Sequence, residues 1–198
     1  MSALALIAFR VRKDEAPPKS AYPRIDSGTL VALREYAFPP LPDVGWPQEA
    51  SEARRLDFGP QWRHGILSLQ PPKEGQAFPV LVPQVDADGN ETDGVRLPEL
   101  AVPLGTYTGW NLRDPSIGAP EQRVSFEGSY IPFARTAEER RKARDPRKSI
   151  EERYGSREDY LDRFTHALDA LVEQRWILPE DRGAVLLRGR QDWDDAMR

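Results

Sequence analysis

The chain has 198 residues, carries 28 basic and 32 acidic side chains for a formal net charge of −4, and contains no cysteine. This balance excludes a basic field of the kind that concentrates nucleic acid or anionic lipid, so no nucleic-acid partner is predicted. The lack of cysteine excludes a disulfide framework, a thiolate metal site and a cysteine nucleophile, and it leaves the compartment unknown. The length fits one domain with at most a small appendage.

Residues 2–9 are apolar but do not have the features of a secretory signal. No basic residue precedes the apolar run, and three basic residues follow it between positions 10 and 13. The run is also far shorter than the roughly 20 residues that a membrane span needs. Because Leu4, Ile7 and Val11 fall on one face at helical spacing, residues 1–14 are predicted to form an amphipathic helix.

Residues 15–135 are rich in proline and glycine. They contain most of the 19 prolines and most of the 14 glycines of the chain. Proline fixes φ and removes a ladder donor, so long helices and a broad central sheet are excluded from this part. Short strands joined by ordered loops are predicted instead, with strands at 29–33, 66–69, 80–85 and 100–104.

Residues 136–198 are highly charged, and their apolar residues follow helical spacing. Thr136 with Glu139, and Ser149 with Glu152, have the spacing of capping boxes that open two short helices. A third helix begins after Ser156, and its apolar stripe is Tyr160, Phe164, Ala167, Leu168, Leu171 and Val172. Pro179 suits the first turn of a fourth. The predicted fold is therefore α+β, with residues 15–198 forming one packed unit.

One segment, residues 86–91, resembles a calcium loop. Asp86, Asp88 and Asn90 alternate as oxygen ligands could, but the glycine is fourth in the run and Leu97 stands where an EF-hand has its glutamate. These three residues are weak metal candidates, and a turn after the strand at 80–85 explains them better. The sequence predicts no metal site and no cofactor.

The segment 105–113 has the most unusual composition. Two glycines bracket Tyr107 and precede Trp110, Asn111 and Arg113. Glycine allows the backbone to approach a ligand closely, so these four side chains are candidates for lining a substrate pocket. The alternative is a glycine-bracketed bend whose aromatic residues fill the core.

A serine-hydrolase triad has few candidates here. The two histidines are His64, beside a turn glycine, and His166, on the third predicted helix. Ser129 is a serine preceded by glycine but lacks elbow spacing, and the motif G-x-S-x-G does not occur. A triad is defined by geometry, and no spacing here indicates one.

Five blocks of the chain carry a family resemblance. They are residues 17–24 without Lys19, 28–31, 79–113, 128–136 and 145–154, in that order. They are similar to the C-terminal segment of the family named "alpha/beta hydrolase domain-containing protein". The resemblance implies that residues 1–14 are the last helix of a hydrolase core, and that the nucleophile elbow, the acid and the histidine loop would precede Met1.

The resemblance implies an accessory C-terminal region of an α/β-hydrolase-type esterase. Such a region would pack on a hydrolase catalytic core, in the same or a separate chain, shape the substrate entrance and be inactive alone. Two alternatives remain open. The chain could be a free-standing protein-interaction module, or a small enzyme whose site the sequence does not reveal.

Overall fold

The computed structural model describes residues 16–48, 53–124 and 127–198. Within them it confirms the predicted α+β class, because short antiparallel strand pairs precede a group of packed helices. The helix predicted within residues 1–14 lies outside the described residues.

The strands form three separate two-stranded antiparallel sheets. The pairs are β1 (Leu30–Ala32) with β4 (Leu81–Pro83), β2 (Arg54–Asp57) with β3 (Lys73–Ala77), and β5 (Gly105–Thr108) with β6 (Ser129–Pro132). The predicted strands at 29–33 and 80–85 are confirmed as β1 and β4. The frequent prolines keep each strand short, since a proline cannot donate to a ladder.

Two predicted strands are wrong. Residues 66–69 belong to the loop that returns between β2 and β3, where the backbone of Ser68 and of Leu69 donates to the carbonyl of Phe58 at 3.0 and 3.1 Å. Residues 100–104 begin in a helical turn, α2 (Pro98–Ala101), because Pro98 suits the first turn of a helix. The ladder of β5 starts only at Gly105.

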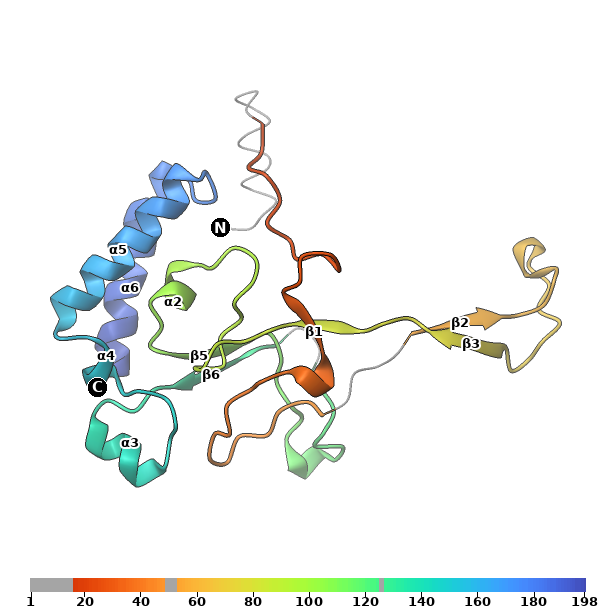
Figure 1. Cartoon of the computed structure of the whole chain (residues 1–198), viewed down its shortest axis with the longest axis horizontal. Coiled ribbons are helices and arrows are strands. Elements are labelled where there is room, and N and C mark those ends of the chain that lie inside the picture. The colour runs from red at the N-terminus through yellow and green to blue at the C-terminus, as the bar shows by residue number, and fades with distance from the viewer. Residues whose placement is uncertain (1–15, 49–52, 125–126) are drawn as a thin grey trace.

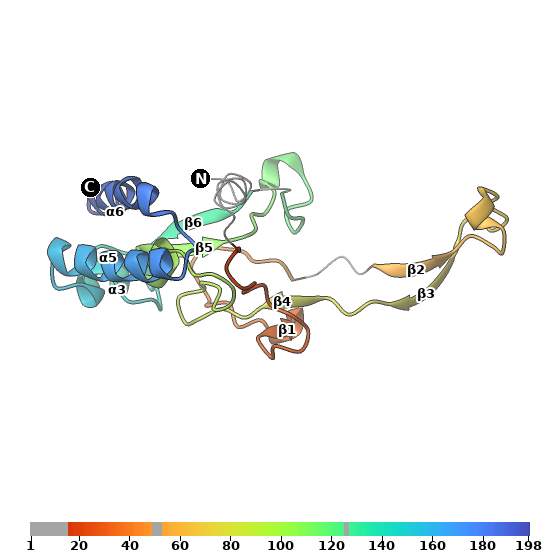
Figure 2. The ribbon, with the colours of Figure 1, turned by 90° about the horizontal axis from the view of Figure 1, so that it is seen from above.

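The β2–β3 hairpin stands clear of the helices as an arm, here defined as residues 53–78 (Figures 1 and 2). β2 and β3 escape prediction because their sequences, RRLD and KEGQA, are mostly polar. Large apolar side chains are nevertheless exposed along the arm, at Leu56, Trp62, Ile66, Leu67, Leu69 and Phe78. An isolated hairpin of this kind is only marginally stable in water, so the arm needs a surface to lie on.

The longer helices follow β6. They are α3 (Ala137–Ala143), α4 (Ile150–Arg153), α5 (Arg157–Glu173) and α6 (Arg182–Ala196), while single 3-10 turns occur at Leu33–Glu35, Trp62–His64, Pro115–Ile117 and Pro179–Asp181. All four predicted helix starts are confirmed, with Pro179 in the turn that leads into α6. None of the described helices is long and apolar enough to cross a membrane.

The predicted capping boxes differ in outcome. Ser149 and Glu152 form a complete box at the start of α4, each side chain binding the other's backbone N–H. Thr136 caps α3 by accepting from the N–H of Glu139 at 3.1 Å. The carboxylate of Glu139 instead accepts from the backbone and guanidinium of Arg135, so this second box is only half formed.

The core lies between α5, α6 and the start of β5. The buried residues of the α5 stripe are Tyr160, Phe164, Leu168 and Leu171, as its spacing predicts. Tyr160 and Phe164 pack with Trp193 of α6, Leu104, and Phe133, which directly follows β6. The proline-rich part and the helical part thus share one hydrophobic cluster, and the helices lie beside β5 and β6 in Figure 1.

Two glycines of α6 give a matched test of this packing. A Cβ on Gly189 would lie 2.7 to 2.9 Å from atoms of the Phe164 ring, whereas a Cβ on Gly183 meets nothing within 4 Å. Gly189→Ala should therefore cost about 1–3 kcal/mol of unfolding free energy through overpacking. Gly183→Ala should stabilise the chain by about 0.5–1 kcal/mol through helix propensity. Equal shifts in the urea midpoints of the two variants would contradict this account of the α5–α6 contact.

Candidate functional site

A cleft of about 720 Å³ lies beside the β5–β6 ladder and α6. One wall is the cross-strand pair of Tyr107 on β5 and Tyr130 on β6, whose ring centroids are 5.0 Å apart. The remaining wall and rim residues come from α2, α3, α6, the end of β6 and the segments that follow β6 and α6. They are Glu99, Pro132, Phe133, Ala134, Arg135, Glu139, Arg188, Asp192, Asp195, Ala196 and Arg198.

The charges of this cleft are only partly paired. Arg135 binds Glu139 at 2.6 Å, and Arg198 binds Asp195 at 3.0 Å. No ion pair among the described residues involves the carboxylates of Glu99 and Asp192, and Arg188 is the remaining guanidinium on the rim. The cleft therefore offers an aromatic wall beside two carboxylates without a direct ion pair, of which Asp192 feels the charge of Arg188. This combination suits an apolar group that carries a cation.

Burial controls the titration of the cleft. It raises the pKa of Tyr107, and burial together with the charge of Asp192 raises the pKa of Tyr130, so both phenols stay protonated at neutral pH. The Tyr130 hydroxyl donates to the carbonyl of Leu104 at 3.3 Å. Burial, followed by the nearby charge of Glu99, raises the pKa of Asp192. These groups can bind and orient a ligand, but the lining contains neither a histidine nor a serine.

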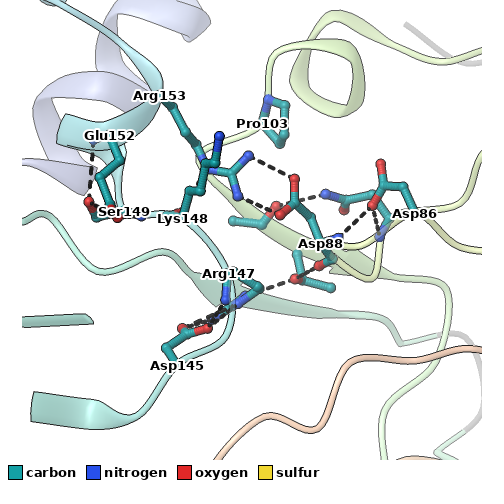
Figure 3. Close-up of polar contacts among 12 residues, drawn as sticks. Asp86, Asp88, Pro103, Asp145, Arg147, Lys148, Ser149, Glu152 and Arg153 are labelled. Carbon is teal, nitrogen blue, oxygen red and sulfur yellow. Dashed lines mark hydrogen bonds and ion pairs between the residues drawn. The ribbon is translucent and has the colours of Figure 1, made fainter. Parts of the chain in front are cut away.

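The metal candidates all have protein partners (Figure 3). Asp86 accepts from the backbone N–H of Asp88 and of Asn90, both at 3.0 Å, and from Arg96 at 3.1 Å. Asp88 forms a two-point ion pair with Arg153. The segment is thus a turn closed by its own side chains, as the sequence predicts, and the described residues contain no cluster of three or more His, Cys, Asp or Glu able to hold a metal.

The turn also anchors β5. The side chain of Asn90 is fully buried, donates to the carbonyl of Gly105 at 3.1 Å and accepts from the N–H of Tyr107 at 2.8 Å. Gly89 has φ of 82°, and a Cβ there would lie 3.0 Å from both Phe38 and Thr106, so only glycine fits without displacement. The strand that carries Tyr107 is therefore fixed by the turn next to it.

Arg147 is the most heavily bonded side chain near the cleft (Figure 3), and it is only 3% exposed. Its guanidinium binds Asp145 at 2.6 Å and donates to the Thr106 hydroxyl at 2.8 Å. It also donates to the carbonyls of Ile131 and Pro132 at 2.9 and 3.1 Å. One side chain from the segment before α4 thus joins β5 to β6 from outside the ladder.

The four predicted pocket residues are not brought together. Tyr107 lines the cleft, while Trp110 packs edge-on against Phe38 at 5.3 Å and lines a smaller hollow of about 170 Å³. The side chain of Arg113 donates to the carbonyls of Gly118 and Ile117 at 3.2 and 3.4 Å. The backbone of Asn111 accepts from Val124 at 2.8 Å. Of the four, only Tyr107 lies in the cleft.

The triad candidates also lie apart. His64 is on the arm, His166 is exposed on α5, and Ser129 is on β6 with its hydroxyl donating to the carbonyl of Trp110 at 3.2 Å. These elements occupy different parts of the molecule in Figure 1. The described residues therefore bring no histidine to a serine in a hydrolase arrangement.

Comparison with known families agrees with the resemblance noted in the sequence. A family model for the alpha/beta hydrolase domain matches residues 2–187. The chain belongs to the alpha/beta hydrolase domain family. A search of curated proteins and a search of solved structures each found no significant match.

Sequence reasoning missed the other cleft residues of this alpha/beta hydrolase family member. Tyr130 is the direct ladder partner of Tyr107, but the β5–β6 register cannot be inferred without knowing that the two segments pair. Glu99 and Asp192 are two acids among the 32 of the chain, on two helices far apart in sequence. Only the folded contact of α2, α6 and β5 distinguishes them.

The Arg147 network predicts a large and specific loss of stability. Arg147→Ala leaves Asp145, which is 10% exposed, without its partner, so the variant should lose about 3–5 kcal/mol of unfolding free energy. Arg157→Ala removes an exposed pair with Asp194 and should lower the unfolding free energy far less, because solvent screens exposed pairs. Chemical denaturation measures both, and similar losses would show that burial of Arg147 has no special weight.

The same ion pair predicts a dependence on pH. Burial alone raises the pKa of Asp145, but the hydrogen bonds and charge of Arg147 outweigh it, so the pKa lies below its ordinary value. The pair's stabilisation is then complete above the unfolded pKa of about 3.9 and is lost as pH falls through the lower folded value. The stability difference between wild type and Arg147→Ala should therefore shrink as the pH falls below about 4. A difference that stays constant down to pH 2 would contradict this.

Proposed function

We propose that this chain is an accessory C-terminal region of an α/β-hydrolase-type esterase, which packs on a catalytic core and shapes the entrance for the substrate. The observation that carries the proposal is a family match over residues 2–187 in a sequence without any G-x-S-x-G motif. An α/β-hydrolase needs that motif to hold its nucleophile on the strand-to-helix turn. On this proposal the nucleophile comes from the core, and the chain is inactive alone.

The cleft is the part of the surface that suits an entrance. Its aromatic pair, Tyr107 and Tyr130, presents an apolar wall, and entrances to ligand sites are mostly apolar with a few polar groups. Trp110, Asn111 and Arg113 follow Tyr107 along the chain but lie outside the cleft, so they remain secondary candidates for substrate contact.

The proposed contact with the hydrolase core would bury apolar side chains, and some of these lie outside the arm. Tyr22 and Ile25 are 82% and 72% exposed. Isolated exposed apolar residues are ordinary, but two large ones within four positions support a buried role in the assembled hydrolase. We assign residues 16–29 to the contact with the core on this basis.

An assay of the purified chain tests the first half of the proposal. The chain alone should neither react with a fluorophosphonate probe nor hydrolyse short p-nitrophenyl esters, because it supplies no activated serine. A family member with an intact G-x-S-x-G core is the positive control. Covalent labelling of the chain by the probe, abolished by Ser129→Ala, would overturn the proposal.

A fusion of this chain to a family core that carries G-x-S-x-G tests the second half. Tyr107→Leu should raise KM for an aryl ester about 2–10-fold while changing kcat little, since it removes aromatic contact made equally in the ground and transition states. Ile117→Ser serves as a control outside the cleft. Unchanged KM in the Tyr107 variant would remove the cleft from the substrate entrance.

A second candidate is a free-standing interaction module, and the arm specifically favours it. Trp62 at the end of the hairpin is 54% exposed, and exposed tryptophans often become binding hot spots. The two candidates differ in their response to a core. An accessory region gives an active esterase when joined to the core, whereas a free-standing module binds a partner without any gain in ester hydrolysis.

A further inference from the structure

The end of the arm is an apolar anchor. We define the tip as residues 61–69, where Trp62 and Ile66 are 54% and 52% exposed and Leu67 is 47% exposed. Backbone bonds within the tip close it, including His64 to the carbonyl of Gln61 at 2.8 Å, so these exposed side chains lie on an ordered loop. A preorganised apolar loop loses little entropy on binding, which favours its use as an anchor.

The arm is also basic in an acidic chain. Residues 53–78 contain four basic and two acidic side chains, a net charge of +2, so the other residues carry −6. At the tip, Arg63 lies 6.0 Å from the centroid of the Trp62 ring, and none of the described carboxylates forms an ion pair with it. The tip thus offers an aromatic ring and an adjacent free cation.

The cleft offers the complementary groups. Its Tyr107–Tyr130 wall matches an aromatic ring. Glu99 and Asp192 form no direct ion pair among the described residues, and the charge of Arg188 acts on Asp192 without pairing with it. The volume of about 720 Å³ lies in the range of roughly 300–1,000 Å³ typical of sites that enclose a compact group. The pairs Arg135–Glu139 and Arg198–Asp195 are each neutral. The charges that remain in the lining are those of Glu99, Asp192 and Arg188, so the cleft carries one excess negative charge.

We propose that the arm tip of one copy enters the cleft of a second copy, and that the exchange is reciprocal, giving a two-fold symmetric dimer. In this dimer the tip occupies the space that the proposed function gives to the substrate, so the two occupancies exclude one another. Trp62 packs against Tyr107 and Tyr130, and Arg63 faces Glu99 and Asp192. The exchange is closed because each copy gives one arm and accepts one, so it does not propagate into filaments.

A second copy is the occupant that the molecule itself indicates. The arm and the helices that border the cleft lie at opposite ends of the molecule, so the tip and the cleft of one copy do not meet (Figures 1 and 2). The opposite net charges of the arm and the rest of the chain favour association between copies over association of arm with arm. Two-fold dimers are also the commonest soluble assemblies.

The test is the mass of the full chain measured by sedimentation equilibrium over a series of concentrations. The wild type should show a monomer–dimer equilibrium. Three variants should each weaken association by about tenfold or more. Trp62→Ser removes the aromatic anchor. Arg63→Glu and Asp192→Lys each place like charges opposite one another in both arm–cleft contacts of the dimer. The double variant Arg63→Glu with Asp192→Lys restores opposite charges and should return the dissociation constant to within about threefold of wild type.

Ile117→Ser is the matched control, because Ile117 is as exposed as the tip residues but belongs to neither arm nor cleft. It should leave the dissociation constant unchanged. A wild-type chain that stays monomeric at every soluble concentration would overturn the proposal, as would a dimer that Trp62→Ser does not weaken or a double variant that shows no rescue. Binding of the arm to a hydrolase core in a chain that does not dimerise would assign the tip to that core instead.

Discussion

The body of this molecule depends on the burial of one guanidinium group. Arg147 bonds to Asp145, to the Thr106 hydroxyl and to the carbonyls of Ile131 and Pro132, so it joins β5, β6 and the segment before α4. A buried charge is costly unless every donor finds a partner. Here the guanidinium donates to carbonyls of β6, which in a wider sheet would accept from a further strand. The ladder is therefore stabilised by a side chain in place of additional strands.

A second arginine extends this arrangement toward the cleft. Arg153 pairs with Asp88 of the 86–90 turn, and both Arg147 and Arg153 lie over the Phe133 ring, at 5.0 and 4.0 Å from its centroid. This turn also holds β5, because the Asn90 side chain bonds to the backbone of Gly105 and Tyr107. The residues that matched a calcium loop by composition thus have a structural role, because their oxygens accept from backbone and guanidinium donors. The cleft owes its fixed aromatic wall to these contacts.

The helical third was largely predictable from the sequence, because Ser149, Ser156 and Pro179 mark helix starts and the stripe from Tyr160 to Leu171 marks the buried face of α5. The proline-rich part was predictable only in β1 and β4, whose residues are apolar. The arm has polar strands, and β5–β6 is defined by pairing across intervening loops, so neither has a local signature. Of the residues that line the cleft, only Tyr107 was among the pocket candidates of the sequence, since the others meet only after folding.

We expect β5, β6, the helices packed on them and the 86–90 turn to form a folded body around the Arg147 network without the hydrolase core, and we expect the arm not to contribute to it. Hydrogen exchange of the dilute chain, measured residue by residue, tests this most directly. Amides of β5, β6 and α5 should exchange slowest and with a common opening free energy, and those of β2 and β3 should exchange far faster. Equal protection of the arm and β5–β6, or no protection in either, would contradict the account.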